Sequence, residues 1–252
     1  MQSFSAAIEQ VAKWLLGASY AVAFTGAGIS TPSGIPDFRS ADSGLWEHVD
    51  PMQVASIFGF RQNPRAFYDW VRPLAIITRD AEPNPAHIAL ATLEQAGLLK
   101  SVITQNIDML HTRAGSVVVR ELHGHMRSMT CIRCFREYDA APYMEALLAD
   151  NILPMCECGG VLKPNVILFG EQLPFQALQQ AKDDARKADV MLIIGSSLEV
   201  EPASSLPLIA KRNGSKIIII NLQPTFLDSA ADLVFHENAA YVLPQIVACM
   251  RV

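Results

Sequence analysis

Residues 20–30 read YAVAFTGAGIS, a short apolar run followed at once by two glycines. An unbroken apolar run bounded by turn residues is typical of a strand buried on both faces of a parallel sheet. The glycines allow a tight backbone turn and the close approach of a phosphate. Because Thr31 stands where the dinucleotide fingerprint has its third glycine, the spacing alone also fits a tight turn without a ligand.

The same kind of segment recurs along the chain. Further apolar runs predict strands at Ser101–Thr104, Val190–Ile194 and Ile217–Ile220, and helical spacing predicts helices at Phe4–Leu16, His87–Ala96 and Phe175–Lys187. Since helices and strands alternate, we expect an α/β fold with a doubly wound parallel sheet. Ser40–Pro85 and His123–Leu162 break this alternation and are expected to be inserts.

Composition narrows the class of protein. Of 252 residues, 50% are hydrophobic and 18% charged, which excludes a disordered chain. The formal net charge of −5 argues against a basic nucleic-acid binder. No apolar run approaches the ~20 residues of a membrane span, and the first residues, MQSFSAAIEQ, do not resemble a secretory signal. We therefore expect a cytoplasmic protein without membrane or nucleic-acid partners.

Four of the five cysteines form two close pairs. Cys131 and Cys134 are spaced C-x2-C, Cys156 and Cys158 are spaced C-x-C, and Cys249 stands alone. Two such pairs fit a tetrahedral Zn²⁺ with four thiolate ligands, and a full ligand set indicates a structural site. Disulfides are the less favoured alternative in a reducing compartment. The sequence thus predicts one structural zinc.

A loop and a strand end each gather polar groups. The loop GIPDFRS places Asp37, Phe38 and Arg39 side by side, where a carboxylate, an aromatic face and a guanidinium can meet a carboxamide, a planar ring and a phosphate. The alternative there is a solvated turn. TQNID, Thr104–Asp108, follows a predicted strand at the edge where open α/β sheets bind ligands. A helix cap is the alternative for Asp108, but three polar groups in four positions favour a site.

Six histidines are candidates for a base near neutral pH. His123, in ELHGHM, precedes a glycine and is the favoured candidate, although local sequence does not separate it from His125. His48, His87 and His236 have no polar cluster beside them in sequence and are expected to be bystanders. His111 is expected to be structural.

Together these motifs resemble the sirtuin family of NAD-dependent protein deacylases. The matching pieces are GAGIS at 26–30, GIPDFR at 34–39, TQNID at 104–108, LHG at 122–124, the cysteine quartet, KPNVILFGE at 163–171, GSSLEVEPA at 195–203 and Asn221–Leu222. The resemblance implies a minimal catalytic core with a Rossmann-like part, approximately 1–39, 86–123 and 163–252. A smaller domain would combine a helical insert, approximately 40–85, with a zinc module, approximately 124–162. HENAA, at 236–240, lacks the Gly-Lys of many relatives.

The resemblance also implies the role of each matching residue. NAD would be bound by Gly26, Ala27, Gly28, Ser30, Asp37, Phe38, Arg39, Gln105, Asn106, Ile107, Asp108, Gly195, Ser196, Ser197, Asn221, Leu222 and Ala239. The acyl-lysine peptide would be bound by Val166, Leu168, Phe169, Gly170, Glu171 and Val200, through strand addition. His123 would be the general base, with Asn106 also catalytic, and the zinc ligands would be Cys131, Cys134, Cys156 and Cys158.

The expected reaction is transfer of an acetyl group from lysine to ADP-ribose, with release of nicotinamide and O-acetyl-ADP-ribose. The resemblance implies that relatives which prefer anionic acyl groups carry a Tyr-x-x-Arg pattern. Here Val71 stands three residues after Tyr68, and Arg72 comes one position later. We therefore expect a neutral acyl group and a monomeric enzyme acting on acetylated proteins. The alternatives are an NAD hydrolase or mono-ADP-ribosyltransferase using the same pocket, or a non-catalytic zinc-ribbon binding module.

Overall fold

The computed structural model describes residues 3–37 and 49–251. Contacts divide the chain into two compact units. The sheet unit comprises Met1–Ser33, Glu82–Leu122 and Phe175–Val252, and the cysteine unit comprises Gly34–Ala81 and His123–Pro174. The chain passes from one unit to the other four times, so each unit is assembled from segments distant in sequence.

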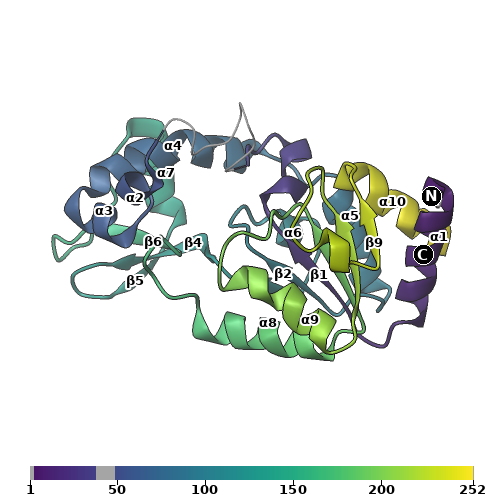
Figure 1. Ribbon diagram of the computed structural model, residues 1–252. Helices are drawn as coiled ribbons and strands as arrows, with labels where there is room; N and C mark the ends of the chain where they lie inside the picture. The colour runs from purple at the N-terminus through teal and green to yellow at the C-terminus, as the bar shows by residue number, and fades with distance from the viewer. Residues whose placement is uncertain (1–2, 38–48, 252) are drawn as a thin grey trace. The chain divides into compact units, whose positions relative to one another are not determined.

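The sheet unit is built on a six-stranded parallel sheet in the order β3-β2-β1-β7-β8-β9 (Figure 1). The strands are β1 (Ala21–Thr25), β2 (Ser101–Thr104), β3 (Val119–Glu121), β7 (Val190–Ile194), β8 (Lys216–Ile220) and β9 (Leu233–Phe235). The strand order reverses direction between β1 and β7, as in doubly wound Rossmann-like folds. The predicted α/β fold class is confirmed.

Helices cover both faces of this sheet. They are α1 (Phe4–Gly17), α5 (Pro85–Gln95), α6 (Leu110–Arg113), α8 (Phe175–Lys187), α9 (Leu206–Arg212) and α10 (Ala239–Met250), with short 3-10 turns at Ala27–Ile29, Thr31–Ser33, Ala203–Ser205 and Asp228–Ala230. Figure 1 shows α5 and α10 side by side on one face and α8 and α9 together on the other. α1 packs against α10.

The central strands are apolar on both sides because both faces are covered. Ala21, Ala23, Leu192 and Ile194 belong to one core cluster with the buried sides of α1, α5 and α10. Alternate residues of the same strands, such as Phe24, are equally buried on the opposite face. The five residues of β1 are all buried, as are the five of β7, which explains their unbroken apolar sequence.

The cysteine unit contains a three-stranded antiparallel sheet in the order β5-β4-β6. Its elements are β4 (Gly124–Cys131), β5 (Glu137–Asp139), β6 (Leu162–Val166), α2 (Pro51–Val54), α3 (Ile57–Gln62), α4 (Pro64–Asp80) and α7 (Ala141–Asp150). Phe60, Phe67 and Tyr68 pack edge to face in the interior of its helical part.

The sequence predicts helix only in pieces over the first insert, whereas α4 runs unbroken for 17 residues. Asn63 caps its first turn by accepting a hydrogen bond from the Ala66 N–H, and Pro64 occupies the first helical position. Pro73 lies inside the helix, which hides the helical signal from a local reading.

The structural division differs from the predicted ranges by a few residues at 34–37, 82–85 and 123. The longest difference is at residues 163–174. These residues remain in the cysteine unit because β6 pairs with β4 in its small sheet. Across residues 3–37 and 49–251, no helix combines the length and apolar character that crossing a bilayer requires.

Candidate functional site

Three strand ends of the sheet unit meet at one edge. Thr25 of β1 is level with Thr104 of β2 and with Ile194 of β7, and all three strands run parallel. The segments that come after these strands therefore leave the sheet at the same edge. Since the strand order reverses here, this is the position at which open α/β sheets bind ligands.

Side chains from two of these segments form a bonded cluster. The Ser30 hydroxyl donates to Asp108 Oδ2 at 2.6 Å, and Asn106 Nδ2 donates to Ser30 Oγ and to the Gly26 carbonyl oxygen, both at 3.1 Å. Asp108 Oδ1 accepts the Leu110 N–H at 2.9 Å, at the start of α6, whose N-cap is Met109. Asp108 therefore belongs to the cluster and also bonds the first N–H of α6, but it does not occupy the N-cap position of that helix.

Gln105 connects the segment after β2 to the segment after β7. Its Nε2 donates to Ser196 Oγ at 2.9 Å, and the same hydroxyl oxygen accepts the Leu198 N–H. Ser196 is buried whereas Ser197 is exposed. Gln105, Asn106 and Ile107 are half-buried, so the edge presents carboxamide groups that are held in place.

Two histidines lie beneath this cluster and were missed by local sequence reasoning. The rings of His87 and His111 meet edge to face with centroids 4.9 Å apart, and both residues are buried. His87 Nε2 lies 3.5 Å from Ser30 Oγ, and His111 Nε2 lies 2.9 Å from Thr25 Oγ1. His87 therefore contacts the cluster, although local sequence places no polar group beside it, because the fold brings α5 under the strand ends.

Burial keeps both rings neutral. Desolvation lowers the pKa of His87 to about 4, opposed by the nearby Asp108 carboxylate. Desolvation, with a smaller contribution from His87, lowers the pKa of His111 to about 3. A detectable sequence signal for His87 was its place three residues after Asn84, where its Nδ1 accepts the Asn84 N–H in a capping box.

The glycines of the first turn serve the packing of the protein itself. The Gly28 N–H donates to the Gly195 carbonyl oxygen at 2.9 Å, and the Gly26 N–H donates to that of Ile194 at 3.0 Å. A Cβ at Gly26 would approach the Gly195 oxygen to 2.7 Å, and one at Gly28 would approach the Gly195 Cα to 2.8 Å. The close approach to residues 194–195 thus requires glycine at both positions, and the approach of a phosphate to this turn stays a prediction.

The remaining predicted NAD residues come from several other segments, and Asp37 belongs to the cysteine unit. Ala27 and Asp37 are half-buried, Asn221 and Leu222 come after β8 with Leu222 exposed, and Ala239 packs into the core at the start of α10. His236 Nδ1 lies 3.1 Å from the Asn221 carbonyl oxygen, and its Nε2 lies 3.3 Å from Asp228 Oδ2. Phe38, Arg39 and His48 lie outside the described residues.

The predicted base and peptide segment share the cysteine unit. The Ile167 N–H donates to the His123 carbonyl oxygen at 2.8 Å, so His123 lies beside the segment that comes after β6. Phe169 donates its N–H to the Ala55 carbonyl oxygen and accepts the Ile57 N–H on its own, which adds a short parallel bridge. Val200 belongs to the sheet unit.

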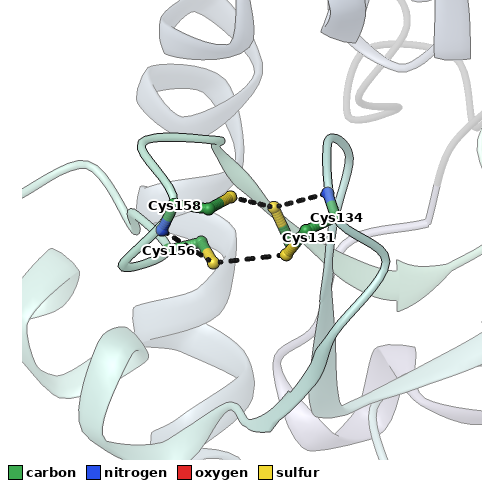
Figure 2. A group of neighbouring side chains, drawn as sticks. All are labelled: Cys131, Cys134, Cys156 and Cys158. Carbon is green, nitrogen blue, oxygen red and sulfur yellow. Dashed lines mark hydrogen bonds between the residues drawn. The ribbon is translucent and has the colours of Figure 1, made fainter.

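Four cysteines converge as their spacing predicts. Figure 2 shows the thiols of Cys131 and Cys134 facing those of Cys156 and Cys158, and the four Sγ atoms all lie within 4.8 Å of one another. Two facing Sγ pairs are 3.5 and 3.6 Å apart, close to the ~3.8 Å edge of a tetrahedron with Zn–S bonds of about 2.3 Å. All five cysteines of the chain are free thiols, so the disulfide alternative is excluded here.

Hydrogen bonds favour the thiolate form at two cysteines of the quartet, Cys131 and Cys156. The backbone N–H groups of Cys134 and Arg133 point at Cys131 Sγ, and chiefly the first of them lowers the pKa of that thiol to about 6. The Tyr138 hydroxyl, 3.0 Å from Cys156 Sγ, lowers the pKa of the Cys156 thiol. The donor set and its spacing fit one structural zinc ion.

The Tyr68 and Arg72 side chains bond to the backbone of the cysteine unit. The Tyr68 hydroxyl donates to the Leu162 carbonyl oxygen, and burial raises the pKa of Tyr68. Arg72 Nε and Nη2 donate to the carbonyl oxygens of Leu147 and Leu148 at 2.9 and 2.6 Å. The Tyr68 hydroxyl is therefore bonded to β6, and the Arg72 guanidinium is bonded to α7.

Known proteins match this chain over most of its length. The Sir2 family model matches residues 26–202. An NAD-dependent protein deacylase 2 of Archaeoglobus fulgidus is 49% identical over 245 residues, which cover 95% of this chain and 94% of the relative. An NAD-dependent protein deacetylase of Sulfolobus acidocaldarius is 47% identical over 240 residues, or 95% of this chain and 94% of the relative.

Solved structures agree with these relatives. A structure described under the mechanism and regulation of Sir2 enzymes has a TM-score of 0.92 and 48% identity, covering 97% of this chain and 98% of that one. A Sir2 variant with a deacetylated p53 peptide and 3′-O-acetyl-ADP-ribose has a TM-score of 0.90 and 38% identity, covering 96% and 97%. Sir2Tm bound to a propionylated peptide has a TM-score of 0.86 and 38% identity, covering 96% and 97%.

A Rossmann-like sheet with a polar strand-end cluster, together with a four-cysteine centre, defines a nucleotide-binding α/β protein with a structural zinc site. The family match extends over more than half of the chain. The chain belongs to the Sir2 family, as its motifs predict.

Proposed function

We propose that this protein is an NAD-dependent protein lysine deacetylase, which transfers the acetyl group of an acetylated lysine to ADP-ribose and releases nicotinamide. The observation that carries the proposal is the bonded cluster of Ser30, Asn106 and Asp108 at the switch point of the sheet. Family membership supports it, since relatives that are nearly half identical are NAD-dependent deacylases and deacetylases.

The residues of the sheet unit would hold NAD. Gln105, Asn106, Asp108, Ser30 and Ser196 offer carboxamide, carboxylate and hydroxyl groups already fixed by hydrogen bonds to one another. Such fixed polar groups suit the hydroxyl and carboxamide groups of the cofactor and need little reorganisation when it binds. NAD supplies the ADP-ribosyl group that accepts the acetyl group, and nicotinamide is the leaving group.

His123 would act as the general base. A neutral imidazole near physiological pH can take a proton from a ribose hydroxyl and return it later. The bond from Ile167 to the His123 carbonyl oxygen fixes the backbone of this residue. Asn106 would orient the reacting sugar through its carboxamide, while zinc, with four thiolate ligands, would stabilise the fold and take no part in the reaction.

The peptide would add as a strand beside residues 166–171, with Val166, Leu168, Phe169, Gly170 and Glu171 as its contacts. The substrate would carry a neutral acyl group, because the two polar groups of Tyr68 and Arg72 are occupied by backbone carbonyl oxygens. In this assignment the sheet unit is the NAD-binding domain and the cysteine unit is the substrate domain with its helical and zinc modules.

We also propose that the enzyme acts as a cytoplasmic monomer on acetylated proteins, without nucleic-acid or membrane partners. Five free thiols suit a reducing compartment. A net charge of −5 disfavours phosphate backbones as partners. Sedimentation of the purified protein at micromolar concentration tests the monomer directly.

The experiment for the activity measures nicotinamide release from NAD with and without an acetyl-lysine peptide. The proposal expects release that depends on the peptide, with one nicotinamide formed per acetyl group removed. Equal release without the peptide would instead identify an NAD hydrolase. ADP-ribose attached to the protein or peptide would identify a mono-ADP-ribosyltransferase.

A further inference from the structure

Lys163 is a largely buried lysine beside the segment assigned to the peptide. Its side chain is 12% exposed, and its Nζ lies 3.0 Å from Glu171 Oε2. The same ammonium group donates to the carbonyl oxygens of Pro164 at 3.0 Å and Val166 at 2.8 Å. An ammonium has three N–H donors, so these three acceptors satisfy it.

Glu171 connects this lysine to the turn after β6. Its Oε2 also accepts the Leu168 N–H at 2.9 Å, and its own N–H donates to the Leu168 carbonyl oxygen at 3.0 Å. Gly170 lies inside this turn with φ of 87°, a left-handed conformation that suits glycine. The carboxylate therefore closes a short turn, and the ammonium ties that turn back to the strand.

The closed turn lies between two further backbone contacts. The Ile167 N–H binds the His123 carbonyl oxygen, and Phe169 exchanges backbone hydrogen bonds with Ala55 and Ile57. The ion pair thus closes a turn whose neighbouring residue, Ile167, is bonded to the backbone of His123. Its cost is also evident, because burial lowers the pKa of Lys163 while the Glu171 carboxylate opposes this shift.

We propose that Lys163 and Glu171 form a positioning clasp that holds residues 166–171 in the conformation that receives the acyl-lysine peptide. This inference rests on the proposed function, since it deepens the role of the same segment. A buried ion pair rarely adds net stability over an apolar pair, but it fixes geometry strictly, because each charge left alone is costly. Lys163 is a positioning residue and acts through the turn.

Substitution of the lysine separates positioning from general stability. Lys163→Met keeps the length of the side chain but removes the charge, so it leaves the Glu171 carboxylate unpaired. We expect KM for an acetyl-lysine peptide to rise by about tenfold or more, with KM for NAD changed by less than about twofold. Lys163→Arg, which restores a cation, should bring the peptide KM back within about threefold of the wild type. Lys13→Met, at an exposed position on α1, is the control.

Hydrogen exchange of the Leu168 amide reports on the clasp without any activity. The Lys163→Met variant should lose protection of this amide while the amides of β7 keep theirs. If the variant falls in thermal stability but keeps its peptide KM and its Leu168 protection, the clasp is wrong and the lysine is merely structural. A double-mutant cycle with Glu171→Gln should be strongly non-additive, and additive effects on peptide KM would also contradict the clasp.

The same experiments distinguish the clasp from the function on which it rests. A wild-type protein that neither binds nor deacetylates the peptide overturns the proposed function and, with it, the role of the clasp in substrate binding. Faster hydrogen exchange of the Leu168 amide in the Lys163→Met variant would then still show that the ion pair restrains the turn. Fluorescence polarisation measures the Kd of the peptide for both proteins. A Kd that rises together with KM shows that the substitution weakens peptide binding.

Discussion

The Ser30 hydroxyl donates a 2.6 Å hydrogen bond to Asp108 Oδ2, although the two residues are 78 positions apart in the chain. The bond joins the turn after β1 to the segment after β2 at the edge where the strand order reverses. Because the other oxygen of the same carboxylate accepts the Leu110 N–H, one aspartate bonds both the cluster and the start of α6. Asp108 is therefore the first residue to substitute.

Replacing the carboxylate should weaken the proposed NAD site. Asp108→Asn preserves the size of the side chain but removes the charge that Ser30 and Leu110 bind as donors. We expect kcat/KM for NAD to fall by about tenfold or more, since bonds to charged acceptors are the stronger ones. Steady-state kinetics check this. Asp183→Asn, on the exposed face of α8, is the matched control, and equal kinetics of the two variants would contradict the assignment.

The buried histidines predict that stability falls in acid. The pKa values of His87 and His111 are lowered to about 4 and about 3 by burial, so below pH 6.5 the unfolded chain binds protons that the folded chain does not. Each histidine should therefore reduce the free energy of unfolding by about 2 kcal/mol between pH 7 and pH 5. Urea denaturation at both pH values measures this loss.

A variant isolates the histidine contribution from acid effects on the zinc centre. His87→Gln should unfold with a shallower pH dependence than the wild type, because one of the two groups no longer titrates. Val117→Ala, at an exposed position without a titratable group, should retain the full slope. If both variants and the wild type share one slope, the histidines do not govern acid stability.

The cysteine centre should hold one zinc ion and depend on a glycine. A Cβ at Gly160 would approach Cys131 Sγ to 2.6 Å, so Gly160→Ala should disturb the ligand set and lower zinc occupancy. Cys158→Ser should lose zinc and unfold at lower temperature, whereas Cys249→Ser should retain both properties. Native mass spectrometry gives the stoichiometry, and a zinc-free wild type that folds normally would refute a structural metal.

The preference for an acyl group should follow from the side chains of Tyr68 and Arg72, which are already hydrogen-bonded within the protein. Since Tyr68 and Arg72 bind backbone carbonyl oxygens, no arginine partner is expected for a succinyl carboxylate. We expect acetyl-lysine peptides to react at least about a hundredfold faster than succinyl-lysine peptides of the same sequence, since an unpaired buried carboxylate is costly. Comparable kcat/KM values for the two peptides would show that this reasoning is wrong.

The parallel sheet was predictable because its central strands are buried on both faces. The ranges predicted for Ser101–Thr104 and Val190–Ile194 match β2 and β7 residue for residue. The small strands β4, β5 and β6 were not predicted, since one side of each faces solvent or polar neighbours and their sequences carry no continuous apolar run. The prediction that four cysteines cluster is confirmed. It could be made from sequence because the short spacing within each pair already places two thiols close together.

The candidate site was predictable only where its residues are neighbours in sequence. Gln105, Asn106 and Asp108 come after one strand, so their shared edge could be inferred from the strand alone. His87 and His111 come from two helices, and only the packing of α5 and α6 brings them under Ser30 and Thr25. The role of Lys163 could not be predicted either, because only the turn after β6 brings its partner Glu171 next to it.

The assignment of the base can be tested by two histidine variants that sequence reasoning does not separate. His123→Ala should reduce deacetylation by about a hundredfold or more, in keeping with loss of a general base. His125→Gln should retain activity within about tenfold of the wild type. The reverse order of effects would move the role of base to His125.

The most direct test of the proposed function traces the acetyl group itself. A peptide with a carbon-13-labelled acetyl-lysine is incubated with NAD and the wild-type protein, and the products are analysed by mass spectrometry. We predict labelled O-acetyl-ADP-ribose, one nicotinamide per lysine released, and no reaction without NAD. Labelled free acetate formed without NAD, or consumption of NAD with the acetyl group still on the peptide, would contradict the account.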